Sequence, residues 1–361
     1  MNALARNLSL VTALSALLCG CAQTGPPLPP SLELPKPPSD LRAGRKGNQV
    51  TLTWTEPTRT TDRQSVRFLG PTRVCRSLQA EMKECGTPIG QLPAPPQATQ
   101  RSGAMQPQLQ VFADTLPSPI PQQNLTGDIT YAVEVLNRDG RSAGLSNRVQ
   151  VAAVPTLPPP PDFHAELGDT GVEFTWTSPG ENSAPGIQHR YRIYRRDEAT
   201  GKDAIASEVP IGEAGPTHTE DSTFEWEKTY LYRVTAVSIL SRTGGETQVE
   251  GDDSPTIRII AHDIFPPAVP AGLQAVYSGE GQKLFVDVIW APATEADLAG
   301  YNVYRREADS APVKLNSDLV KSPAYRDSAV ASGKTYHYSV SAVDVRGNES
   351  ARSEEASETV P

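Results

Sequence analysis

The sequence predicts an all-β chain built from three β-sandwiches in tandem. Proline and glycine, 34 and 27 of 361 residues, make up about a sixth of the chain, which excludes a mainly helical protein. Apolar and polar residues alternate along many short segments, as they do in half-buried strands. A tryptophan-bearing segment also recurs, and Trp54, Trp176 and Trp290 follow one another at spacings of 122 and 114 residues. Repeats of this length with many short strands and turn signals are typical of sandwiches.

Each repeat begins with the tryptophan-bearing strand, continues with an aromatic strand and then has a long alternating strand. The recurrence and the alternation place the three tryptophans in the cores. In the first repeat, 66–69 and 72–76 stand in for the aromatic strand. The expected tryptophan strands are 50–54, 172–176 and 284–290, the aromatic strands are 191–196 and 301–306, and the long strands are 129–135, 230–236 and 336–342.

The N-terminus has the pattern of a secretory signal peptide over residues 1–20. Arg6 is the sole charged residue before Glu33, and an apolar run of about eleven residues follows it. That run is too short for a membrane-spanning helix, which needs ~20 residues. A buried N-terminal helix is the alternative interpretation.

The end of this segment, Leu18-Cys19-Gly20-Cys21, resembles the bacterial lipobox, from which Cys19 at the second position is a mild departure. The resemblance implies that the Cys21 thiol takes a diacylglyceryl group, with palmitate as a typical acyl chain, and becomes the new N-terminus. The resemblance further implies the outer membrane of a diderm cell, because the residue after the cysteine is Ala22 rather than Asp. We therefore expect a lipid-anchored protein that faces the periplasm or the cell surface, because several acyl chains anchor a protein stably.

Removal of residues 1–20 with acylation of Cys21 leaves two thiols, Cys75 and Cys85, in an oxidising compartment. A disulfide between them is the economical interpretation. It would close a loop of about eleven residues and contribute roughly 2–3 kcal/mol. A metal site needs more ligands, and a CxxC redox pair needs closer spacing.

Proline-rich stretches separate the expected parts of the chain. The segment 21–39 holds seven prolines, and at ~3.1 Å per residue such a tether reaches up to ~60 Å. A Pro- and Gln-rich insertion at 76–109 interrupts the first repeat, and whether it is ordered is left open. The expected organisation is a signal peptide at 1–20, a tether at 21–40, a divergent first domain at 41–154, a second at 159–262 and a third at 266–361.

The three repeats resemble fibronectin type III domains, which have an immunoglobulin-like fold. The third repeat carries the resemblance best, through Trp290, Tyr301, Tyr336 and the alternation that follows it. Tyr230 and Tyr336 stand where the family has its tyrosine corner, whose hydroxyl bonds back to the backbone. The first repeat has Ile129 at this place and departs most.

The sequence offers little material for catalysis. The five histidines are scattered, and HExxH, GxSxG, Walker and Rossmann patterns are absent. We therefore expect no enzymatic activity and no cofactor. With a net charge of −9, we expect no nucleic-acid partner, because the phosphate backbone repels an acidic protein.

Two features are candidates for contact with a partner. Trp226 precedes the corner Tyr230 and has no counterpart in the third repeat, so it either caps its own sandwich or offers a stacking surface. The first repeat is basic, with net charge +4 over 21–157, whereas 158–262 carries −9. Cations of the first repeat are either ordinary surface charges or a contact to phosphate-bearing lipid or polysaccharide; they are Arg42, Arg45, Lys46, Arg59, Arg63, Arg67, Arg73 and Arg76.

The leading functional hypothesis is a non-enzymatic, lipid-anchored envelope protein that serves as a binding platform or spacer for another envelope protein. One alternative is a carbohydrate-binding or adhesion module at the cell surface, with polysaccharide as the partner. A second alternative is an accessory to outer-membrane assembly. It rests on the segment after Cys21, which resembles the start of small lipoproteins that attend the lipopolysaccharide translocon.

Overall fold

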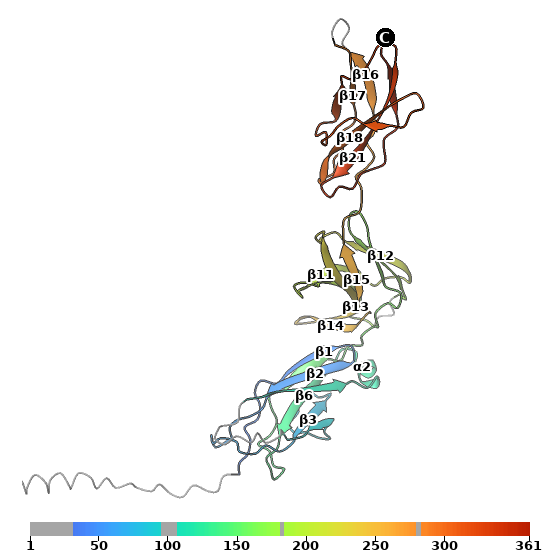
Figure 1. The fold of residues 1–361 in the computed structure, drawn as a ribbon. Helices are drawn as coiled ribbons and strands as arrows, with labels where there is room; N and C mark the ends of the chain where they lie inside the picture. Colours follow the sequence, from blue (N-terminus) through green and yellow to red (C-terminus); the bar gives the residue numbers. More distant parts are fainter. Residues whose placement is uncertain (1–31, 95–106, 181–183, 279–282) are drawn as a thin grey trace, which may run out of the picture. The chain divides into compact units, whose positions relative to one another are not determined.

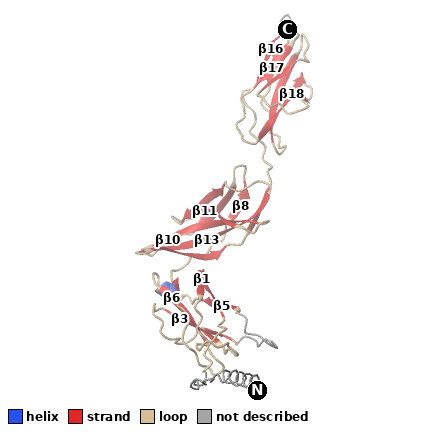
Figure 2. Cartoon of the chain, turned by 90° about the vertical axis from the view of Figure 1, so that its left-hand side faces the viewer, coloured by secondary structure: helices blue, strands red, loops and turns tan. Residues whose placement is uncertain are grey.

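The computed structural model describes residues 32–94, 107–180, 184–278 and 283–361, and its elements are almost all strands (Figures 1 and 2). The chain divides into two compact units. Unit 1 runs to Thr156 and also includes Leu240–Glu250, and unit 2 holds Leu157–Ile239 and Gly251–Pro361. Among the described residues, none forms a helix of the length and apolarity that a bilayer crossing requires. Cys21 and the segment 1–31 lie outside the described residues.

The first sandwich packs the sheet β4-β3-β6-β7 against the strands β1-β2-β5 around one core. β14 (Gly245–Asp253) pairs in parallel with β1, at Lys46 and Glu250. Trp54 and Tyr131 are among its largest fully buried side chains, as the alternation of their strands predicts. One short helix, α2, precedes β6. The elements are β1 (Arg42–Lys46), β2 (Gln49–Thr55), β3 (Thr72–Ser77), β4 (Gly90–Leu92), β5 (Leu109–Thr115), α2 (Pro119–Gln123), β6 (Asp128–Val135) and β7 (Val149–Ala152).

Two parts of the first repeat differ from the expectation. Within the expected insertion, β4 pairs with β3, so part of that segment belongs to the sandwich, while 95–106 lie outside the described residues. Residues 32–40, expected in the tether, are bonded to the sandwich: Pro35 forms a bridge with Thr60, and Asn147 N donates to Pro38 O at 3.2 Å. Backbone N–H and C=O groups beside a sheet edge form hydrogen bonds with it. The proline content of residues 32–40 does not reveal these bonds.

The second sandwich has its core around Trp176, Tyr191 and Tyr232. One sheet has the order β12-β9-β8, and in the other β10 lies between β11 and β13, with β15 also paired to β13. The strands of this part of the chain are β8 (His164–Leu167), β9 (Val172–Ser178), β10 (Ile187–Asp197), β11 (Asp203–Pro210), β12 (Gly215–Asp221), β13 (Lys228–Arg242), β14 (Gly245–Asp253) and β15 (Ile257–Ala261). The end of β13 and β14 as far as Glu250 belong to unit 1.

The third sandwich packs the sheet β16-β17-β20 against β19-β18-β21-β22. Its core includes Trp290, Tyr301 and Tyr338. The tryptophan itself follows the end of its strand. The elements are β16 (Gln274–Ser278), β17 (Phe285–Ile289), β18 (Leu298–Glu307), β19 (Val313–Lys314), β20 (Ala324–Asp327), β21 (Thr335–Asp344) and β22 (Ala356–Thr359).

A buried Tyr–Asp–Arg network recurs in all three sandwiches, and sequence reasoning missed it. In the third, Tyr338 Oη donates to Asp327 at 3.0 Å and Arg305 Nη1 lies 2.6 Å from the same carboxylate. The low dielectric of the core strengthens such charge-assisted bonds and makes an unpaired member costly. The corresponding groups are Tyr131, Asp114 and Arg76 in the first sandwich and Tyr232, Asp221 and Arg195 in the second.

The tyrosine corners expected at Tyr230 and Tyr336 are confirmed. Glu225 N donates to Tyr230 Oη at 3.1 Å, and Ala331 N donates to Tyr336 Oη at 2.9 Å. In each case the hydroxyl lies five residues from its partner and fixes the loop before the long strand. Ile129, at the corresponding place in the first sandwich, is fully buried and offers no hydroxyl.

Candidate functional site

One end of the first sandwich brings three segments together: 32–36, 58–70 and 136–142. Thr61 N donates to Leu34 O at 2.9 Å, which joins the first segment to the second. These segments include the point at which the described chain begins. We call the surface that they form the tether-end face.

The third segment is fixed to the other two by equally short bonds. Asn137 Nδ2 donates to Leu32 O at 2.9 Å, and Gly70 N donates to Leu136 O at 2.8 Å. A Cβ on Gly70 would lie 2.3 Å from Asn137 O, so this close approach requires glycine. The tether-end face is therefore held by backbone bonds rather than by side chains alone.

Six exposed cations lie on these segments, and no carboxylate of the described residues forms an ion pair with any of them. The acidic groups of the same segments are Glu33, Asp62 and Asp139, which leaves an excess of three positive charges. The six cations are Lys36, Arg59, Arg63, Arg67, Arg138 and Arg141.

Four of the eight cations that the sequence analysis grouped are engaged elsewhere. Lys46 pairs with Glu250 at 3.5 Å, Arg73 with Glu134 at 3.4 Å, and Arg76 belongs to the buried network. The guanidinium of Arg45 donates to backbone carbonyl groups, and its desolvation lowers the arginine pKa to about 10. Of the other four, Arg42 lies on β1, and Arg59, Arg63 and Arg67 lie on the tether-end face. The structure adds Lys36, Arg138 and Arg141 to these three.

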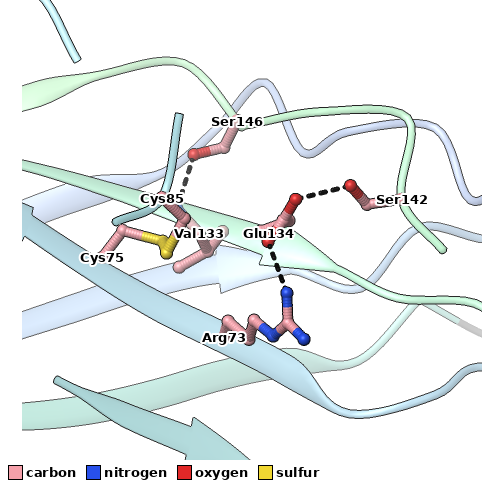
Figure 3. The surroundings of a disulfide bond; sticks show 7 residues. All are labelled: Arg73, Cys75, Cys85, Val133, Glu134, Ser142 and Ser146. Carbon is pink, nitrogen blue, oxygen red and sulfur yellow. Dashed lines mark hydrogen bonds and ion pairs between the residues drawn. A yellow bond between two sulfur atoms is a disulfide. The ribbon is translucent and has the colours of Figure 1, made fainter. Parts of the chain in front are cut away.

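Cys75 and Cys85 form a disulfide with a Cα–Cα distance of 5.3 Å (Figure 3). Cys75 lies on β3, which pairs with β6, and Cys85 closes the loop that follows β3. Met82, within the loop, is buried, and its carbonyl accepts bonds from the Arg148 guanidinium at 2.9 and 3.0 Å. These contacts tie the loop to the sandwich. The open basin along 76–86 has a mixed polar and apolar lining and no convergent set of reactive groups.

Trp226 lies in the corner loop of the second sandwich and is half-buried. Its ring contacts Phe224 edge-on at a centroid distance of 4.8 Å and lies 6.1 Å from Phe265. Both Phe224 and Trp226 pack against the core of that sandwich. Because neighbouring rings take up part of its surface, this placement favours the capping interpretation over a free stacking platform.

Three carboxylates of unit 2 come together, because oxygen atoms of Asp263, Asp297 and Asp344 lie within 4.8 Å of one another. Among the described residues, this is the cluster that could hold a metal ion. Asp344, however, already accepts bonds from Arg346 N and Asn348 N at 2.8 and 2.9 Å. Burial alone would raise the pKa of Asp344, but the hydrogen bonds from Asn348 and the turn backbone hold it below its usual range. This turn geometry accounts for Asp344 without a cation.

A buried serine–histidine pair is the arrangement that comes nearest to catalytic chemistry. Ser238 Oγ lies 3.1 Å from His189 Nδ1. Ser238 is fully buried, so a substrate carbonyl has no access to its hydroxyl. We therefore interpret the pair as a buried hydrogen bond that joins two strands of the core.

Comparisons with known proteins match parts of the chain. No protein-family model matches. An amylopullulanase of Thermoanaerobacterium saccharolyticum is 35% identical over 88 residues, 24% of this chain and 6% of that protein. An amylopullulanase of Thermoanaerobacterium thermosulfurigenes is 33% identical over 94 residues, 26% of this chain and 5% of that protein. The chain thus spans about a twentieth of the length of these curated relatives.

Two solved structures match 27% and 91% of this chain. A Fn3-like protein from Clostridium thermocellum is 33% identical and covers 27% of this chain and 96% of its own, with a TM-score of 0.23. The FN1-FN3 domains of chicken CNTN1 are 16% identical and cover 91% of this chain and all of their own, with a TM-score of 0.25. The two-sheet topology and the corner tyrosines decide the fold. These are fibronectin type III-like β-sandwiches.

The fibronectin type III-like fold explains why the candidate residues do not converge on one active site. Strands supply the cores, and variable side chains lie on the loop ends and outer faces. Of the sequence-predicted residues, Cys75 and Cys85 meet, and Trp226 lies on a different sandwich from them. The tether-end face is the surface where unpaired charge gathers.

Proposed function

We propose that the chain is a lipid-anchored, non-catalytic envelope protein whose fibronectin type III-like sandwiches act as a binding platform or spacer for another envelope protein. The observation that carries this proposal is the order of the parts. A lipobox-like sequence ends at Cys21, and a sandwich begins within about twenty residues of it. Three sandwiches in one chain then present loop ends and strand edges for contact with a protein.

The anchor and the platform have separate roles in this account. Acylation of Cys21 would hold the chain at the outer membrane, on its periplasmic or its outer face. The binding energy for a partner would come from the sandwich surfaces, which need no cofactor. The likeness to Fn3-like proteins supports a module without catalytic groups.

Fractionation of cell envelopes tests the anchor with a matched pair of variants. Cys21→Ser removes the expected acyl acceptor, whereas Cys19→Ser changes a neighbouring cysteine that the account leaves unmodified. We expect the wild type and Cys19→Ser in the outer-membrane fraction and Cys21→Ser in the soluble fraction. Retention of Cys21→Ser in the membrane would overturn the anchored role.

Crosslinking from intact cells tests the platform. A photoreactive residue at an exposed loop position of the first or third sandwich is expected to capture the same envelope protein repeatedly. Protease treatment of intact and lysed cells assigns the face of the membrane. Capture that persists in an unfolded variant, or that never exceeds a control position on a buried strand, would contradict the platform.

A carbohydrate-binding role is the second candidate, because the matched relatives are amylopullulanases. Trp226 would then contribute a stacking surface beside Phe224. Affinity electrophoresis in polysaccharide gels tests this role. Loss of retardation in Trp226→Ala, with retention in Trp226→Phe, would favour it over the platform, and no retardation of the wild type would exclude Trp226 as such a site. The third candidate, assistance to outer-membrane assembly, rests on residues 21–31, which lie outside the described residues.

A further inference from the structure

The tether-end face combines uncompensated charge with exposed apolar side chains. Leu32 and Phe68 are 58% and 38% exposed. The Arg138 guanidinium lies 5.9 Å from the centre of the Phe68 ring. Basic side chains surrounding apolar ones are typical of surfaces that lie at the boundary between lipid headgroups and acyl chains.

The charges of this face are arranged for an anionic surface. The guanidinium groups of Arg67 and Arg141 form no ion pair with a carboxylate of the described residues, and both side chains are exposed. In the second and third sandwiches many arginines are held by nearby carboxylates, as Arg192 is by Glu208 at 2.6 Å and Arg306 by Glu355 at 2.5 Å. The tether-end face therefore gathers six cations without a carboxylate partner among the described residues, whereas most arginines of the other two sandwiches have one.

The length of the preceding chain limits how far this face can lie from the anchor. Leu32 is eleven residues after Cys21, and at ~3.5 Å per residue these span at most about 40 Å. Leu32 is itself bonded to the face through Asn137. An acylated Cys21 would thus hold this end of the sandwich, rather than any other, close to the membrane.

We propose that the tether-end face lies against the anionic headgroups of the membrane that anchors the chain. This inference rests on the proposed function, because the lipid anchor brings the face to the surface. The excess of three charges gives weak binding by itself, since each cation contributes modestly at a lipid surface. Tethering raises the effective concentration, so weak contacts are sufficient to orient the first sandwich.

Vesicle sedimentation tests the face without the acyl chains. The mature chain, from residue 21 with Cys21→Ser, is mixed at about 0.1 M salt with vesicles of phosphatidylcholine alone or with one quarter phosphatidylglycerol. We expect the apparent partition coefficient to rise at least about fivefold with phosphatidylglycerol. Equal partition into both kinds of vesicle would overturn the proposal.

A pair of charge-reversal variants separates this face from net charge. Arg67→Glu with Arg141→Glu reverses two cations of the face, and Arg42→Glu with Lys83→Glu makes the same change of net charge elsewhere on the first sandwich. We expect the first pair to lower the partition coefficient at least about tenfold and the second by less than about threefold. An equal fall in both pairs, with both variants folded by circular dichroism, would contradict a specific face.

Two further measurements test whether the face binds free phosphate instead of lipid and whether Cys21 is acylated. Inorganic phosphate, added at constant ionic strength, is expected to leave vesicle binding unchanged, and displacement would assign the face to free phosphate instead. Metabolic labelling with a fatty-acid analogue reports acylation of Cys21 independently. Labelling without vesicle binding would support acylation of Cys21 and contradict membrane contact by the tether-end face. Vesicle binding without labelling would support membrane contact by this face and contradict the lipid anchor.

Discussion

The first and third sandwiches share one internal design but close their loops differently. Both bury a tryptophan and a Tyr–Asp–Arg network. The third fixes the loop before its long strand with the Tyr336 corner, whereas the first has Ile129 there. The first instead carries the Cys75–Cys85 disulfide on another loop. The comparison teaches that both sandwiches depend on the buried Tyr–Asp–Arg network. The device that holds a loop in place, a tyrosine corner or a disulfide, differs from one sandwich to the other.

A second fastening in the first sandwich is an asparagine side chain. Asn147 Oδ1 accepts from Leu41 N, and Asn147 Nδ2 donates to Leu41 O, both at 2.9 Å. Leu41 is 106 residues away in sequence and belongs to the core. The Asn147 side-chain amide therefore bonds the backbone N–H and C=O of Leu41 in the way that a neighbouring strand would.

Loss of the buried network is expected to have the largest effect. Asp327→Ala leaves Arg305 and Tyr338 without their shared acceptor, and we expect the third sandwich to lose about 3–5 kcal/mol of unfolding free energy. Asp114→Ala should cost the first sandwich a similar amount. Urea unfolding followed by tryptophan fluorescence measures both. Asp309→Ala, at an exposed position, is the control and should change stability by less than about 0.5 kcal/mol. A loss below about 1 kcal/mol for both buried aspartates would show that the network is not the common requirement.

Removal of the disulfide is expected to affect only the first sandwich. Cys75→Ala with Cys85→Ala should lower its stability by about 2–3 kcal/mol, because the open loop gains entropy in the unfolded chain. Differential scanning calorimetry should show one transition moved and those of the other sandwiches unchanged. An unchanged first transition would mean that the loop contacts of Met82 and Arg148 alone fasten this region.

Removal of a corner hydroxyl is expected to have a smaller effect. Tyr336→Phe should destabilise the third sandwich by about 1 kcal/mol, because the bond from Ala331 N is lost while the ring stays packed. Tyr230→Phe should do the same in the second. Tyr277→Phe, at a tyrosine outside the corners, serves as the matched control. Equal loss of stability in Tyr336→Phe and in its control would show that the corner hydroxyl does not stabilise the third sandwich specifically.

The smallest expected difference between the first and third sandwiches is in how their stability depends on pH. Burial alone would raise the pKa of Glu349, but bonds from Ser341, Tyr304 and Asn302 hold it below its usual range. Stability from such a group is present above the unfolded pKa of about 4.3 and is lost as the pH falls through the lower folded pKa.

Glu56 of the first sandwich behaves in the opposite way. Burial raises the pKa of Glu56, against a bond from Gln110, so acidification removes a penalty there. We therefore expect the third sandwich to lose more thermal stability than the first between pH 5 and pH 3, as calorimetry would measure. Glu349→Gln should flatten this dependence, and exposed Glu354→Gln should not. Equal acid lability of the two sandwiches would contradict the assignment.

The strands and the buried aromatics could be predicted from the sequence because alternation reports directly which face is buried. The network aspartates could not, because Asp114, Asp221 and Asp327 occupy strand positions where a charge is ordinarily taken as solvent-facing. A usable signal did exist, since Asp221 and Asp327 each precede their tyrosine partner by eleven residues.

The tether-end face illustrates the other limit of sequence reasoning. Net charge identified the first repeat as basic, but strand register decides which cations meet a carboxylate. Arg73 lies opposite Glu134 on the neighbouring strand, whereas Arg141 comes from a turn that meets the face only in the folded chain. Composition alone cannot distinguish the two arginines.

Mass spectrometry of the mature N-terminal peptide tests the central claim most directly. The anchored-platform account predicts a chain that begins at Cys21 with a mass increase equal to a diacylglyceryl group, and this modified peptide should be absent from Cys21→Ser. A chain that begins elsewhere, or an unmodified Cys21 at the N-terminus of the membrane-associated protein, would contradict the account.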